Sequence, residues 1–168
     1  TSTQSYSDTV TVSGGSRTLS GSGLSLAAVD LGSNTLTASE SGTGTISGVI
    51  AGTGALTKSG AGTLTLSGAN TYSGDTTVNA GTLKLTGALN TATDVVLNGT
   101  SVWDLQAAQT VASLSMASGS SIARSAGTSS LTVSGASTLA NSVSTSGAQT
   151  YQGAVTLAAA TTLTASTV

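Results

Sequence analysis

The sequence of 168 residues predicts an all-β fold, a parallel β-solenoid of roughly eight turns with about 20 residues in each turn. An antiparallel sandwich or barrel would show similar short strands, but three observations favour the solenoid. Corners are short and glycine-centred, and Asn98-Gly99 is the single Asn-Gly pair of the kind that marks tight hairpins. Predicted inward positions are mostly Val, Leu, Ile and Ala, as a narrow coil requires. Similar phrases recur about every 20 residues: TLTLSG from Thr63, TLKLTG from Thr82 and SVWDL from Ser101.

Strands are predicted where apolar and hydroxyl residues alternate between glycine-containing corners. Leu64 and Leu66, for example, alternate with Thr63 and Thr65, which is the period of a half-buried strand. The predicted strands are Thr9–Val12, Leu24–Leu31, Thr35–Ser39, Gly44–Ile50, Ala55–Lys58, Thr63–Leu66, Thr76–Asn79, Thr82–Leu85, Asp94–Leu97, Ser101–Leu105, Thr110–Met116, Ser121–Arg124, Leu131–Val133, Ala154–Leu157 and Thr161–Thr164. We expect them to form one solenoid segment spanning residues 1–168.

Composition argues against several classes of function. Charged residues form 6% of the chain and the net charge is −2, with the four basic residues dispersed, so neither nucleic acid nor an anionic membrane surface is expected as a partner. The chain has no Cys and no His, so we expect no disulfide framework, no metal site and no cofactor. No apolar run approaches the roughly 18 residues of a membrane-spanning helix, and we expect no membrane insertion by this segment.

The central part of the chain resembles a known repeat. Gly48 to Leu83, which contains LTKSGAGTLTLSGANTYSG, is similar to the passenger-associated repeat of bacterial autotransporters. Gly99 to Ile122 resembles the segment that follows this repeat in such passengers, and Val29 to Gly48 also fits, so the resemblance covers residues 26–133. It implies a right-handed parallel β-helix exported by type V secretion to the bacterial surface or the medium. The membrane barrel of that family has no counterpart here. The start at Thr1, without Met or signal peptide, indicates a mature product or an excised segment.

The two ends of the chain resemble each other. Residues 144–168 are similar to repeats of haemagglutinin-like exoproteins and also to residues 1–25. With one residue of slippage, the matched pairs are Gln4 with Gln149, Tyr6 with Tyr151, Val10 with Val155, and Leu19 with Leu163. Neither Thr1–Gln4 nor Thr161–Val168 supplies a capping element. We therefore expect each end to stack on an adjacent repeat or an identical copy, because a bare backbone ladder templates pairing.

No catalytic residue is predicted. Asp75 and Asp94 lie about one turn apart, as do Lys84 and Asp104, which we expect to form an ion pair on the outer surface. Two stacked charges are typical of a solvated surface, although polysaccharide-cleaving enzymes also use this fold and two carboxylates. Serines without His or Cys nearby have no usual base. Lys58 follows Thr where a phosphate loop needs Gly, so its segment is interpreted as a corner of the coil.

Aromatic and hydroxyl side chains are the remaining candidates for surface contacts. Tyr6, Tyr72 and Tyr151 lie beside predicted corners, where exposure would allow contact with a glycan. Trp103 alternates with Asp104 and is expected to point into the core. Four T-x-T pairs would resemble the array of an ice-binding protein if they stacked on one face: Thr9/Thr11, Thr35/Thr37, Thr63/Thr65 and Thr162/Thr164.

The sequence thus predicts a non-enzymatic, structural β-solenoid of a secreted or cell-surface bacterial protein. Its expected role is that of a stiff stalk or fibre segment in adhesion or biofilm contact. The main alternative is a subunit that assembles head to tail into a filament; an enzyme fragment acting on polysaccharides and an ice-binding solenoid are minor alternatives. Expected partners are adjacent repeats or identical copies stacked end to end, together with host or matrix glycans.

Overall fold

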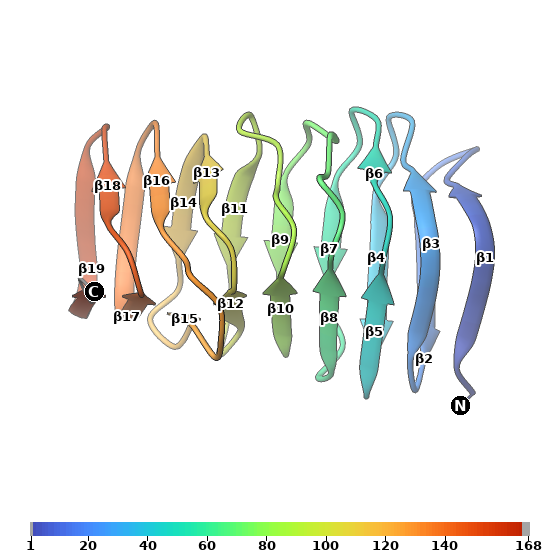
Figure 1. Ribbon diagram of the computed structural model, residues 1–168, viewed down its shortest axis with the longest axis horizontal. Coiled ribbons are helices and arrows are strands. Elements are labelled where there is room, and N and C mark those ends of the chain that lie inside the picture. The colour runs from blue at the N-terminus through green and yellow to red at the C-terminus, as the bar shows by residue number, and fades with distance from the viewer. Residues whose placement is uncertain (1, 166–168) are drawn as a thin grey trace.

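The computed structural model describes residues 2–165, which form a parallel β-solenoid containing strands and corners but no helix (Figure 1). The strands are β1 (Gln4–Thr11), β2 (Arg17–Gly21), β3 (Leu24–Asp30), β4 (Leu36–Glu40), β5 (Thr43–Ile46), β6 (Ile50–Ala51), β7 (Leu56–Lys58), β8 (Thr63–Leu66), β9 (Thr76–Val78), β10 (Thr82–Leu85), β11 (Asp94–Leu97), β12 (Val102–Leu105), β13 (Gln109–Val111), β14 (Ser113–Met116), β15 (Ser121–Ala123), β16 (Leu131–Val133), β17 (Ser137–Thr145), β18 (Gln149–Tyr151) and β19 (Val155–Ala165). Every strand pairing is parallel and joins successive turns.

Each turn of the coil passes over three faces. Face A stacks β1, β3, β5, β8, β10, β12, β15 and the second halves of β17 and β19. Face B contains β6 beside the bent end of β3 and, further along, β13, β16 and β18. Face C stacks β2, β4, β7, β9, β11, β14 and the first halves of β17 and β19. About eight turns at about 4.8 Å each give a rod about 40 Å long.

The coil is right-handed, as the resemblance implied. In Figure 1 the near strands β3 and β5 point upward and the far strands β4 and β7 point downward, while the chain advances from right to left. This sense of winding is the common one for parallel strands joined by crossovers.

The interior consists of columns of apolar side chains in register. On face A, Leu64 lies beside Leu83, then Trp103, then Ile122, and all four side chains are essentially inaccessible. Every second residue of a strand points into the coil. The parallel register aligns these inward residues with the inward residues of the next turn. Trp103 therefore packs in the core as predicted.

Glycine at the corners is required by the close approach of successive turns. A Cβ atom added to Gly62 would lie 1.9 Å from the carbonyl oxygen of Gly42, and one added to Gly54 would lie 1.9 Å from that of Asn34. Any larger side chain would force the turns apart, so the corner glycines determine how tightly the coil stacks.

Face B is incomplete in the middle of the rod, and side-chain amides replace the missing ladder. Between β6 and β13 only an isolated bridge joins Ala69 to Ala88. Asn70 Oδ1 accepts a hydrogen bond from the backbone N–H of Ile50, and Gln109 Oε1 accepts one from that of Leu89. Both amides are nearly inaccessible, so they satisfy backbone groups that water does not reach.

Predicted and observed strands agree best where alternation is strict. Strands β8, β10, β11 and β16 have the predicted bounds. The predicted Gly44–Ile50 and Thr110–Met116 are each divided into two strands by a corner, and β2, β17 and β18 were not predicted. Strand β17 has too irregular an apolar pattern to identify, because it bends from face C to face A at Asn141, whose φ is +58°. Thr1 and the last three residues of Thr161–Val168 lie outside the described residues.

Candidate functional site at the open ends of the solenoid

The two ends of the rod leave inward-facing residues uncovered. Tyr6 at one end is 43% exposed, and Val155, Leu157 and Leu163 at the other are 46%, 62% and 49% exposed. Their neighbours in the adjacent turn, such as Leu26 beside Tyr6, are buried, so exposure reflects the lack of a further turn. Exposed backbone ladders with apolar side chains are typical pairing surfaces.

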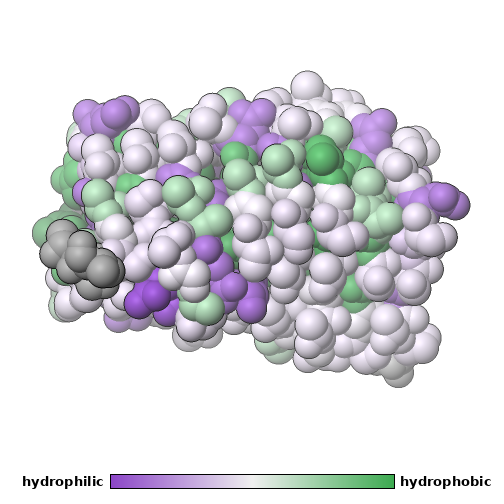
Figure 2. Space-filling view, in the orientation of Figure 1, coloured by the Kyte–Doolittle hydropathy of each residue, from purple (hydrophilic) through white to green (hydrophobic). Residues whose placement is uncertain are grey.

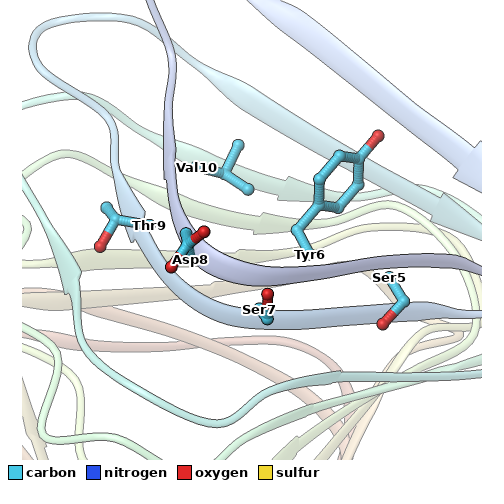
Figure 3. Close-up of a pocket in the computed structure, with 6 residues that line it drawn as sticks. All are labelled: Ser5, Tyr6, Ser7, Asp8, Thr9 and Val10. Atoms are coloured by element: carbon cyan, nitrogen blue, oxygen red, sulfur yellow. The ribbon is translucent and has the colours of Figure 1, made fainter.

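The N-terminal end is hollowed along β1. An open cavity of about 390 Å³ is lined by residues 5–10 (Figure 3). Tyr6 and Val10 project to the same side of the strand. The bend arises from a bulge, because the pairing with β3 shifts between Tyr6 and Thr9. The charged side chains at this end are those of Asp8 and Arg17.

The C-terminal end is uncharged and is formed by β18 and β19. Tyr151 is half-buried and donates a hydrogen bond to Gln149 Oε1, and burial raises the pKa of Tyr151 to about 12. Gln149 Nε2 donates to the carbonyl oxygens of Val143 and Thr164. These bonds connect β18 on face B to the parts of β17 and β19 on face A. Residues 125–165 include no charged side chain, so this surface offers apolar, hydroxyl and amide groups.

Tyr72 does not belong to any surface site, and the prediction that it is exposed is wrong. Its side chain is inaccessible and its hydroxyl lies 2.5 Å from Thr76 Oγ1. Burial raises the pKa of Tyr72 well above its ordinary value. The ring turns inward where face B lacks a strand, so it fills space in the core. Of the three tyrosines, only Tyr6 and Tyr151 are therefore accessible.

A buried ion pair inside the coil was not predicted. Lys58 Nζ lies 2.9 Å from Glu40 Oε1, and both side chains are inaccessible. The ammonium group also donates to the carbonyl oxygens of Gly60 and Ala80, whereas Glu40 Oε2 receives no hydrogen bond. Alternation contained the signal, since Leu56 and Lys58 share the inward side of β7. The structure thus places residues 52–55 in a corner and Leu56–Lys58 in β7, with the ammonium group of Lys58 buried inside the coil.

The stacked charges on the outside behave differently from one another. Lys84 and Asp104 are paired in register, but no ion pair joins them, so that prediction is wrong. Asp104 instead accepts hydrogen bonds from the backbone N–H of Ser125 at 2.8 Å, from Ser125 Oγ at 2.5 Å and from Gln106 Nε2 at 3.1 Å. These contacts hold the long corner between β15 and β16 against face A.

The acidic residues predicted one turn apart do occupy equivalent positions. Thr76 pairs with Val95, which places Asp75 and Asp94 at the same point of successive turns. Asp94 Oδ1 accepts a hydrogen bond from Ser113 Oγ at 2.6 Å, so it is part of a surface ladder. Within residues 2–165, no group of three or more acidic side chains is arranged to hold a metal ion.

Hydroxyl groups form partial ladders on the outside. On face C, Thr37 lies between Thr18 and Thr57, and Thr77 follows, before Val96 interrupts the series. The T-x-T pairs therefore do not form one uninterrupted array. Figure 2 shows a surface of mostly intermediate hydropathy, as Ser, Thr and Gly produce, with hydrophilic groups in small patches.

Comparison with known families agrees with this architecture. Residues 56–85, from β7 to β10, match the family model of the passenger-associated-transport-repeat. Neither the curated proteins nor the solved structures contain a significant match. The repeat and the β-solenoid together fit an autotransporter passenger and indicate a secreted or cell-surface protein. In the described residues, no helix is long and apolar enough to cross a membrane. The resemblance of residues 144–168 to haemagglutinin-like repeats stays a prediction.

Proposed function

We propose that this chain is a non-enzymatic, structural segment of an exported bacterial protein, acting as a stiff stalk or fibre segment in adhesion or biofilm contact. The observation that carries the proposal is the unbroken parallel pairing on faces A and C from β1 to β19. Backbone hydrogen bonds then run along the rod axis in every turn, so bending it requires stretching many bonds at once. Apolar columns inside the coil add to this stiffness.

The composition of the outer faces supports the same role. Hydroxyl and glycine residues dominate them, and the chain provides no histidine or cysteine for nucleophilic or metal chemistry. Export outside the bacterium is proposed from the repeat at residues 56–85. Host or matrix glycans are proposed as contacts of the accessible surface, and Tyr6 and Tyr151 are candidate stacking residues at an end of the rod that no further turn or copy covers.

A length-matched replacement tests the mechanical role. In the exported protein, residues 2–165 are replaced by a Gly/Ser linker of about 50 residues, whose root-mean-square span is also about 40 Å. We expect adhesion or biofilm formation to fall while export, measured by surface labelling, is unchanged. An unrelated rigid solenoid of equal length is the control and should restore adhesion. Full adhesion with the flexible linker would contradict the stalk function, and failure of the rigid control would favour specific glycan binding.

A further inference from the structure

The start and the end of the chain match each other in sequence, but they do not occupy equivalent places in the coil. Gln4 and Tyr6 lie on face A, whereas Gln149 and Tyr151 lie on face B. Likewise Val10 is on face B and Val155 on face C. The matched residues are thus offset by one face, in the direction in which the chain winds.

This offset is the one that continuation of the solenoid requires. The last described strand half, Thr161–Ala165, lies on face A, so the next strand of an unbroken coil would lie on face B, directly above β18. A second copy rotated by one face would place Gln4–Tyr6 of β1 above Gln149–Tyr151. The end of β1 would then lie above the first half of β19, and β2 above Thr161–Ala165.

We propose that copies of this solenoid stack head to tail, with the first turn of one copy on the last turn of another and a rotation of one face between them. The inference rests on the structural role proposed above and names its partner, a second copy of this chain. Without the rotation, β18 would face β1 of the second copy across two strand spacings, about 9.6 Å, which leaves the ladder on faces B and C unpaired.

The proposed register superposes like side chains at five inward positions, whereas Arg17, which is on the same side of β2 as Leu19, would lie above Thr161. Gln4 lies above Gln149, Tyr6 above Tyr151, Val10 above Val155, Val12 above Leu157 and Leu19 above Leu163. All of these residues belong to inward columns, since their partners within the chain, such as Leu24, Leu131 and Val143, are buried. Identical side chains stacked in parallel strands form apolar and amide ladders.

The surroundings of these residues are compatible with stacking. Within residues 2–165, four of the five exposed large hydrophobic side chains lie at the two ends, and the fifth, Val49, is on the flank. Among the described residues, Gln4 Oε1 has no hydrogen-bond partner. Gln149 Nε2 already donates to the carbonyl oxygens of Val143 and Thr164, so an amide ladder between the copies requires Gln149 to exchange one of these bonds for one to Gln4 Oε1. The bulge at Ser7–Asp8 falls above the corner at Gln152–Gly153, so both turns bend at the same point. Residues 125–165 have no charged side chain, so the C-terminal end neither repels nor neutralises Asp8 and Arg17.

A head-to-tail contact of this kind does not close on itself. The two surfaces that meet, the N-terminal end along β1 and the C-terminal end formed by β18 and β19, are at opposite ends of the rod. Copies therefore add one after another and form an open filament. Each added copy would extend the rod by about 40 Å and rotate it by one face.

Association of the purified chain is the first test. Light scattering and electron microscopy should show species larger than 15.9 kDa that grow into rods as concentration rises. Leu157→Asp and Leu163→Asp should each raise the concentration of half-association by about tenfold or more, because a charge would be buried at the contact. Val49→Asp is the control, because Val49 is similarly exposed but lies on the flank of the rod, and it should leave association unchanged. Monomers at all concentrations, or equal effects of all three variants, would overturn the proposal.

Cysteine pairs test the register, since the natural chain has no cysteine. Ser5 and Thr150 both point outward and would be directly opposed across the contact, at a spacing that a disulfide can bridge. The variant Ser5→Cys/Thr150→Cys should therefore form intermolecular disulfides on oxidation. Ser5→Cys/Thr164→Cys, the pair opposed in the unrotated arrangement, should not. Cross-linking of the second pair alone would overturn the rotation. A chain that remains monomeric would refute stacking, while the linker replacement would still test the stalk function independently.

Discussion

Lys58 Nζ and Glu40 Oε1 lie 2.9 Å apart inside the solenoid, where neither side chain is accessible to solvent. The two residues end β7 and β4 on the inward side of face C, one turn apart. A buried pair of this kind compensates two charges that would otherwise be costly to remove from water. It therefore ties two successive turns together at a corner where glycine-rich backbone contributes few side-chain contacts.

Removal of one partner of this pair should be more harmful than removal of both. Lys58→Met leaves the Glu40 carboxylate buried without a counter-ion and should lower the free energy of unfolding by about 3–5 kcal/mol. Glu40→Leu/Lys58→Met should lose less than Lys58→Met alone, since no charge remains buried. Urea unfolding measures both. Lys84→Met, on the outer side of face A, is the control and should change stability little. A lower free energy of unfolding in the double variant than in Lys58→Met would contradict this account.

A methyl group added at a corner glycine should destabilise the stacked turns more strongly where the backbone of the neighbouring turn lies closer to the new Cβ atom. Gly62→Ala would place Cβ 1.9 Å from the carbonyl oxygen of Gly42, and backbone cannot yield as a side chain does. We expect a loss of about 3 kcal/mol or more, the upper range for overpacking. At Gly147 the corresponding distance is 3.2 Å. Gly147→Ala should therefore be much milder, and similar melting temperatures for the two variants would argue against the stacking explanation.

High pH should weaken the solenoid through its buried tyrosines. Burial raises the pKa of Tyr151 to about 12 and that of Tyr72 further, while the unfolded chain titrates near 10. The unfolded state thus releases protons first, so stability is full below pH 10 and declines between about pH 10 and 12 for Tyr151. Tyr72→Phe should reduce the decline. Phenolate absorbance measures the ionisation of the tyrosines, and denaturation at several pH values measures the decline in stability. A flat stability profile above pH 10 would refute the prediction.

Asp104 should protect the corner between β15 and β16 from proteolysis. Its carboxylate accepts hydrogen bonds from the backbone and the hydroxyl of Ser125, directly after Arg124. Asp104→Ala removes both acceptors, so local opening should become more frequent and trypsin should cleave after Arg124 several-fold faster. Asp94→Ala, which removes one hydroxyl contact on face C, is the control. Equal cleavage rates in the two variants would show that the corner is held by other contacts.

Much of the fold follows from local pattern. Strict alternation in Thr63–Leu66 and Thr82–Leu85 predicted strand bounds and facing, and the recurrence of similar phrases about every 20 residues predicted that these strands stack. Where alternation fails, prediction fails too. Strand β2 has one apolar residue, Leu19, and β17 changes face in mid-strand, so neither has a period that a sequence window detects.

The open ends were only partly predictable. The likeness of Gln4 and Tyr6 to Gln149 and Tyr151 was visible in the sequence, but their offset by one face depends on how many faces the chain has traversed. The number of faces depends on every corner in the chain between Tyr6 and Gln149. A local pattern contains no information about it.

By itself, then, the sequence determined the strand period, the repeat and hence a parallel coil with an aliphatic interior, because these depend on neighbouring residues. Only the tertiary structure decided which side chains the next turn covers. It placed Tyr72 and Lys58 inside and left Tyr6 and Leu157 open. The physical reason is that burial in a solenoid is provided by residues about 20 positions away, through the register of stacked turns, and not by the strand on which a residue lies.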